Sequence, residues 1–310
     1  GDVAIEGGRI AAVGNVVGQA KRTIDASGLA VAPGFLDVHT HYDAQLAWDP
    51  YCTPSCFHGV TTVLMGNCGF AMAPVADEAA KDYLIGLFAA TEQVPRSVLE
   101  AGVPFAWKTY PDFLTWLGKQ GLGINVMAQV GHSALRTYVM GDAALERAAT
   151  PQEIGRMAQL AAEGLAAGAA GVSTSQVAHQ RDDKDRHIPT FFAEDPEIIA
   201  LAQTIRASDH GFICMNPRTK IFGPYPQDGE FMAHLAEVSG APITWNEFGQ
   251  RSNEPNIWRD VLAWMEAAID AGRPIYAIAR SAAQEPAFDL LGASPLLANL
   301  EGWPEFGKLD

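Results

Sequence analysis

The sequence predicts an α/β fold of the TIM (β/α)8 barrel type, preceded by part of a small β-sandwich. From residue 31 onward, short apolar runs of strand length alternate with amphipathic stretches of helical length. Near-continuous apolar strands that alternate with helices indicate a parallel sheet covered by helices. An open doubly wound sheet usually carries a glycine-rich phosphate loop after its first strand. A pair of histidines follows that strand here, which favours the barrel.

The first 30 residues have a different texture and predict short strands joined by turns. DVAIEGG is followed by RIAAVG, with Gly7 and Gly8 at the hairpin position, and a further strand is expected to end near Ile24. We therefore expect residues 1–30 to form a partial β-sandwich segment and residues 31–310 to form the barrel.

The barrel region contains seven predicted strands and six predicted helices. The strands are expected at 35–39, 61–65, 124–130, 171–175, 212–216, 243–248 and 275–278. The helices are expected at 77–90, 111–119, 151–167, 195–208, 228–239 and 257–271. A complete barrel has eight strands. The chain opens on Gly1 and stops at Asp310, so both ends look cut, and we expect a fragment whose barrel lacks its C-terminal part.

Composition and charge exclude several classes of protein. Hydrophobic residues make up 48% of the chain and charged residues 18%, which is enough apolar material for a large core and unlike a disordered chain. The formal net charge of −15 argues against a nucleic-acid partner, for which a basic patch is expected. The longest apolar runs are too short to cross a membrane. Four cysteines and no secretory leader predict a cytoplasmic protein.

The sequence His39-Thr40-His41 stands at the carboxyl end of the first predicted barrel strand. Barrel enzymes place their active sites at that end. Residues i and i+2 of a strand point to the same side, so both imidazoles can converge on one metal ion. Two ordinary polar loop residues are the alternative interpretation.

Cys68 follows the second barrel strand and stands between Gly66 and Gly69. A thiolate at that position would be a strong zinc ligand, with a bond of about 2.3 Å. A small buried hydrophobic side chain is the commoner role of a free cysteine. Both interpretations stay open on the residues alone.

Four further polar residues stand at the ends of later strands and are candidates for substrate binding. They are His132, Asn216, Arg218 and Asn246. The asparagines could hydrogen-bond an amide or carboxylate group of a substrate. Arg218 could hold a substrate carboxylate through a bidentate pair, or it could make a surface salt bridge.

Several motifs resemble a known enzyme family. PGFLDVHTHYDAQ at 33–45 resembles the opening strand of the amidohydrolase superfamily. GVTTVLMGNCGFAMAP at 59–74 is similar to the N-acyl-D-amino-acid deacylases, also called D-aminoacylases, and the segments QVGHSALR and GAAGVSTS fit the same family. The resemblance implies a barrel hydrolase that removes the acyl group from a small N-acyl amino acid with a metal-activated water. It also implies that His39, His41 and Cys68 hold the metal, with one zinc ion expected and another divalent metal left open.

The sequence departs from the family pattern at two positions. The family places metal-binding histidines at the ends of the fifth and sixth strands, and these positions are Asn216 and Asn246 here. An amide oxygen is a much poorer zinc ligand than imidazole. The catalytic aspartate that the family carries after its eighth strand is expected beyond residue 310.

Three functions follow from these observations. The first is hydrolysis of a carbon–nitrogen bond other than a peptide bond, as in the N-acyl-D-amino-acid deacylases. The second is a single-metal amidohydrolase that acts on a cyclic amide or another carbon–nitrogen bond. The third is a catalytically impaired barrel that binds a small ligand.

Overall fold

The computed structural model describes residues 1–208, 210–218, 226–250 and 255–279. The chain divides into two compact units, Gly1–Phe35 and Leu36–Asp310. The candidate site lies entirely in the second unit.

The first unit is built around one β-hairpin. Strands β1 (Asp2–Glu6) and β2 (Arg9–Gly14) pair antiparallel. The connecting residues Gly7 and Gly8 both have positive φ, as a type I′ turn requires. The strand expected to end near Ile24 is wrong, because no strand forms between β2 and Phe35. In this unit β1 and β2 pair only with one another, so residues near Ile24 find no neighbouring strand.

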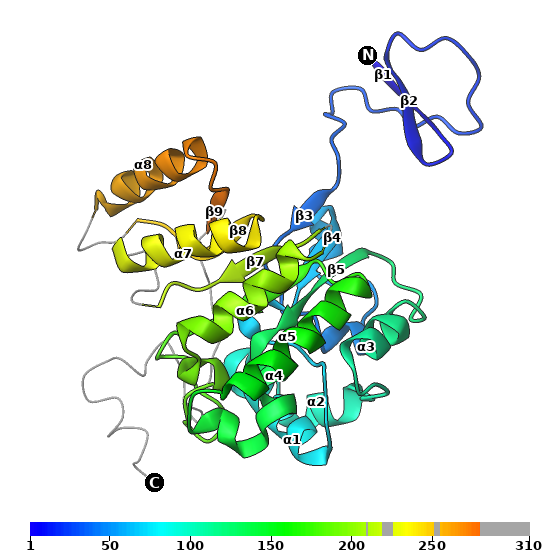
Figure 1. Ribbon diagram of the computed structural model, residues 1–310. Coiled ribbons are helices and arrows are strands. Elements are labelled where there is room, and N and C mark those ends of the chain that lie inside the picture. Colours follow the sequence, from blue (N-terminus) through cyan, green and yellow to red (C-terminus); the bar gives the residue numbers. More distant parts are fainter. Residues whose placement is uncertain (209, 219–225, 251–254, 280–310) are drawn as a thin grey trace. The chain divides into compact units, whose positions relative to one another are not determined.

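The second unit contains a seven-stranded sheet that curls into a half-barrel (Figure 1). Its strands follow one another in sequence order, and every neighbouring pair from β4 to β9 is parallel. The strands are β3 (Phe35–Asp37), β4 (Val60–Met65), β5 (Asn125–Gly131), β6 (Gly171–Thr174), β7 (Phe212–Met215), β8 (Ile243–Phe248) and β9 (Ile275–Ala279). The predicted α/β barrel-type fold, with seven strands, is confirmed.

All six predicted helices are present, and among the described residues two further α-helices were missed. The predicted ones are α1 (Glu78–Thr91), α3 (Tyr110–Leu117), α5 (Pro151–Ala166), α6 (Asp195–Arg206), α7 (Pro226–Ser239) and α8 (Ile257–Asp270). The missed helices are α2 (Arg96–Gly102) and α4 (His132–Met140). Helix α4 begins directly after β5 and has no side-chain N-cap, so the sequence lacks the usual signal of a helix start.

The apolar core lies between the strands and the helices that run along them. Helices α4, α5 and α6 lie side by side next to β5, β6 and β7 (Figure 1). Side chains such as Val130, Leu165 and Ile213 are almost completely buried between these layers. Among the described residues, no helix is long and apolar enough to cross a membrane.

Helix α5 begins with a complete capping box. The Thr150 hydroxyl accepts a hydrogen bond from the Glu153 N–H, and the Glu153 carboxylate accepts one from the Thr150 N–H at 2.7 Å. Arg147 also donates to that carboxylate, and these bonds lower the pKa of Glu153 to about 2. The two orphan N–H groups are thereby satisfied, which fixes the start of the helix.

We predict that Thr150→Ala lowers the free energy of unfolding by about 1 kcal/mol, because the helix loses its N-cap acceptor. Urea denaturation measures the change. Thr150→Ser keeps the hydroxyl and should retain most of the stability. Equal stability of the alanine variant and the parent protein would contradict this role.

Candidate metal centre

The candidate residues gather where the parallel strands end. His39 and His41 follow β3, and Cys68 follows β4. Asn216 follows β7, and Asn246 lies in the second half of β8. The carboxyl ends of parallel strands meet at one edge of a sheet, so residues far apart in sequence can converge there.

The two histidines do not belong to a strand, which corrects the sequence prediction. Strand β3 ends at Asp37, and residues 38–41 are irregular. Thr40 ties this segment to β4, because its N–H and its hydroxyl both donate to the Leu64 carbonyl, at 3.0 and 2.8 Å. The two imidazoles therefore converge through this anchor rather than through strand alternation, and their ring centroids are 5.3 Å apart.

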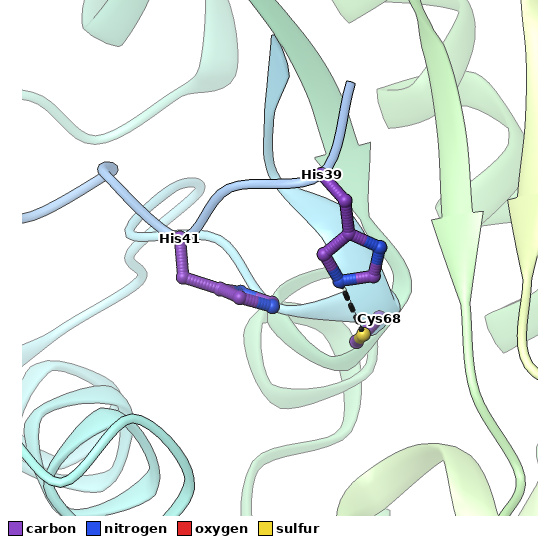
Figure 2. Close-up of side chains that lie close together, drawn as sticks. All are labelled: His39, His41 and Cys68. Atoms are coloured by element: carbon purple, nitrogen blue, oxygen red, sulfur yellow. Dashed lines mark hydrogen bonds between the residues drawn. The ribbon is translucent and has the colours of Figure 1, made fainter. Parts of the chain in front are cut away.

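His39, His41 and Cys68 form one cluster of potential metal ligands (Figure 2). One ligand atom from each side chain lies within 4.8 Å of the other two. The His39 Nε2 atom is 3.4 Å from the Cys68 Sγ atom. The buried His41 Nδ1 atom makes no hydrogen bond, and the Glu92 carboxylate is 3.7 Å away. Two imidazoles and a thiol are typical zinc ligands, and an unsatisfied buried nitrogen fits a bound cation.

Two ionisable groups at the cluster have shifted pKa values. Burial lowers the pKa of His41, but the Glu92 carboxylate and the Cys68 thiol outweigh it, so the net shift is upward. Burial raises the pKa of Asp43 to about 7 although the Gly66 N–H donates to its carboxylate at 3.0 Å. That hydrogen bond joins the segment of the histidines to the loop of Cys68.

The loop that carries Cys68 has an unusual backbone. Gly66, Cys68 and Gly69 all have positive φ, of 78°, 55° and 77°. A Cβ atom on Gly66 would lie 2.3 Å from the Gln129 carbonyl oxygen, so only glycine fits there. Cys68 has a side chain and still adopts the left-handed conformation, which costs on the order of 1–3 kcal/mol. Such strain is concentrated at functional sites.

Ser173 on β6 forms hydrogen bonds with this loop, a role that was not predicted from the sequence. Its hydroxyl accepts a hydrogen bond from the Gly69 N–H at 3.0 Å and donates a short one to the Gly66 carbonyl. One side chain thus ties both glycines that flank Asn67 and Cys68. The signal in the sequence was a serine within a completely buried strand, where a polar group needs a partner.

Asn216 and Asn246 lie beside the cluster. The Asn246 Oδ1 atom is 2.9 Å from the His39 Nδ1 atom, and its Nδ2 donates to Asn216 Oδ1 at 2.9 Å. The two positions where the family resemblance implied histidines therefore join the candidate site as a hydrogen-bonded pair of amides.

His132 belongs to a separate buried ion cluster. It is fully buried at the start of α4, with Nε2 2.6 Å from Glu197 Oε1 and Nδ1 2.8 Å from Thr174 Oγ1. Arg136, also fully buried, donates to the same Glu197 carboxylate. Burial raises the pKa of Glu197, but the bonds from His132 and Arg136 outweigh it and hold that pKa below its ordinary value. The structure does not bring His132 together with the metal-ligand candidates.

Arg218 makes a salt bridge, as the alternative interpretation of this residue predicted. Its Nη1 atom is 2.6 Å from Asp195 Oδ1, and its guanidinium lies 3.8 Å from the centre of the Phe231 ring. Contact with a substrate carboxylate stays a prediction.

We predict that Glu197→Gln lowers the free energy of unfolding by about 3–5 kcal/mol, because the Arg136 charge is left buried without its partner. In the parent protein the pKa of Glu197 is lower in the folded chain than in the unfolded chain. The ionised carboxylate therefore stabilises the folded state at pH values above the ordinary pKa of glutamate, and this stabilisation is lost as the pH falls through the folded-state pKa. Urea denaturation as a function of pH measures both effects. Glu78→Gln, at an exposed pair with Lys81, is the matched control and should cost less than about 1 kcal/mol. A similar loss in both variants would contradict the prediction.

We also predict that Cys68→Gly is more stable than Cys68→Ala by about 1 kcal/mol in the presence of a chelator, because glycine adopts positive φ without steric cost. Cys214 lies in the regular strand β7 and provides the control. There the order should reverse, with glycine less stable than alanine by about 0.5–1 kcal/mol. The same order at both positions would show that Cys68 is not strained.

This chain is similar to several known proteins over most of its length. Residues 22–283 match the model of the amidohydrolase family. The D-aminoacylase of Alcaligenes xylosoxydans xylosoxydans is 41% identical over 213 residues, which cover 68% of this chain and 39% of that protein. A solved D-aminoacylase, described with a binuclear metal centre, superposes with a TM-score of 0.70 and 31% identity over 87% of this chain and 52% of that chain.

A second solved relative carries zinc. The N-acyl-D-glutamate deacylase of Bordetella bronchiseptica, solved with zinc and a phosphonate inhibitor, superposes with a TM-score of 0.61 and 25% identity over 79% of this chain and 46% of that chain. The chain thus spans between 39% and 52% of the length of these three relatives. Since the family model matches most of its length, the chain belongs to the amidohydrolase family.

Proposed function

We propose that this chain is the metal-binding part of a hydrolase that cuts carbon–nitrogen bonds other than peptide bonds and removes the acyl group from N-acyl-D-amino acids. The observation that carries the proposal is the convergence of His39, His41 and Cys68 within 4.8 Å at the carboxyl edge of the sheet. The names of the relatives, a D-aminoacylase and an N-acyl-D-glutamate deacylase, support the same substrate class.

The three side chains would hold one divalent ion, with zinc as the expected metal. Zinc supplies Lewis acidity, which polarises an amide carbonyl and lowers the pKa of water to about 7. To a bound ion the imidazoles would contribute neutral nitrogen and Cys68 a thiolate, a mixed donor set that suits zinc better than magnesium or calcium. The anchors at Thr40 and Asp43 keep the donors in place before the metal arrives.

Other residues of the chain would orient the substrate. The amides of Asn216 and Asn246 lie next to His39, where they can meet an amide or carboxylate group. Arg218 would exchange Asp195 for a substrate carboxylate. Both ring nitrogens of His132 are engaged in the buried ion cluster, so we propose that it supports the fold of the site. We expect the catalytic base to be the aspartate that the family resemblance implies after the eighth strand.

The first test is the metal content of the purified protein. We expect about one zinc per chain, and we expect His39→Ala and Cys68→Ala to lose it, because each removes a ligand. His58→Ala is the matched control, since His58 is exposed and lies before β4, at the opposite edge of the sheet. A protein that binds no divalent metal would contradict the proposal and would favour an impaired barrel that binds a small ligand.

The second part of the test is a substrate panel. N-acyl-D-amino acids should be hydrolysed faster than their L-enantiomers and faster than cyclic amides. Loss of a residue that hydrogen-bonds to a metal ligand typically lowers activity by roughly 10–100-fold. Loss of a metal ligand itself should lower kcat/KM by more than that. Preference for cyclic amides would replace this substrate class by the second candidate function.

A further inference from the structure

We infer that Asn67 is a positioning residue that holds the segment of His39 and His41 and the turn of Cys68 in the mutual arrangement that binds a metal ion. In this role Asn67 acts through the backbone of both segments. The inference deepens the proposed function and rests on it for the bound ion. No role of Asn67 was predicted from the sequence.

The Asn67 side chain connects the two segments that carry the candidate ligands. Asn67 is completely buried and immediately precedes Cys68 in the turn after β4. Its Nδ2 donates to the Thr40 carbonyl at 3.2 Å and to the Leu64 carbonyl at 2.9 Å. Thr40 is the residue between the two histidines, and Leu64 lies in β4. One amide group therefore joins the middle of the histidine segment to the strand and to the turn.

The direction of the Asn67 amide is fixed by the nature of its partners. Both are backbone carbonyl oxygens, which can only accept, so the atom that faces them must be the Nδ2 donor. Oδ1 then faces the other side, where the buried Cys214 thiol donates to it at 3.4 Å. Turning the amide over would place Oδ1 against two carbonyl oxygens and leave buried polar groups without partners, which is unfavourable.

The bonds of Asn67 belong to a closed set around the histidine segment. Thr40 itself donates to the Leu64 carbonyl through its N–H and its hydroxyl, so that oxygen accepts from both Thr40 and Asn67. On the other side of His41, the Asp43 carboxylate accepts from the Gly66 N–H. Hydrogen bonds on both sides of His41 thus restrict its segment to one arrangement relative to the turn of Cys68.

This arrangement has a consequence for metal affinity. A binding site gains affinity when its groups are already in place, because binding then orders fewer parts of the protein. The ligand atoms of His39, His41 and Cys68 lie within 4.8 Å of one another. Without the Asn67 donor, a bound ion would itself have to hold the two segments together. We therefore expect the loss of this donor to lower metal affinity as well as folding stability.

Zinc affinity of folded variants tests this expectation. Asn67→Leu has a similar size and no donor, and it should weaken zinc binding by about tenfold or more, a loss of about 1.4 kcal/mol or more in binding free energy. Asn67→Ser has a single O–H donor and should lie between Asn67→Leu and the unmutated protein. It also keeps the test available if the leucine variant fails to fold.

Two controls separate positioning from a general loss of stability. Leu165→Ala creates a cavity in the buried core at α5 and should destabilise the fold without changing zinc affinity. Cys214→Ala removes the contact on the Oδ1 side of the Asn67 amide and leaves both donor bonds intact, so its zinc affinity should also equal that of the unmutated protein. Urea denaturation measures the stability of each variant.

Hydrogen exchange in the unmutated, metal-free protein gives a readout that needs no zinc. Both Nδ2 protons of Asn67 should exchange slowly, and their NMR signals are assigned by their absence from Asn67→Leu or Asn67→Ser. Fast exchange of these protons, or equal zinc affinity of the unmutated protein and the Asn67 variants, would overturn the inference. Slow exchange in a protein that binds no zinc would overturn the proposed function and support the link that Asn67 makes between the two segments.

Discussion

The left-handed turn at Gly66–Gly69 is the constraint on which the site depends. Gly66 lets the end of β4 approach the β5 backbone at a distance that no side chain would permit. Ser173 then ties the carbonyl of Gly66 and the N–H of Gly69 to β6. Cys68 is held between them at positive φ, a conformation that an L-residue keeps only when its surroundings enforce it. The thiol is thereby fixed 3.4 Å from His39 Nε2.

The rest of the centre is attached to this turn by a few buried hydrogen bonds. Thr40 binds the histidine segment to the backbone of β4, and Asp43 accepts from the N–H of Gly66 itself. From the other side, Asn246 contacts both His39 and Cys68. The site thus draws on the ends of β3, β4, β6 and β8, which a curled parallel sheet brings together although they are distant in sequence. This is the general location of active sites in barrel enzymes, and it agrees with membership of the amidohydrolase family.

Much of this arrangement could be predicted from the sequence, because apolar runs and helix-start signals are local. All seven strands of the barrel region were found, and the helix expected at 151–167 begins at Pro151 as predicted. The strand near Ile24 was wrong because a strand also needs a partner, which a local pattern does not reveal. Helix α4 was missed because it follows β5 without a cap. The engagement of Ser173 and of the Asn246 amide depends on contacts between distant strands, so no spacing rule could supply it.

We propose that a turn after β4 and a segment after β3 together bind one metal ion through one sulfur and two imidazole nitrogens. X-ray absorption spectroscopy at the zinc edge of the loaded protein tests this most directly. We expect one sulfur at about 2.3 Å and two nitrogens at about 2.0–2.1 Å, with the sulfur shell absent in Cys68→Ser. A coordination shell without sulfur, or with a second sulfur from Cys214, would contradict the assignment of His39, His41 and Cys68 as the ligands.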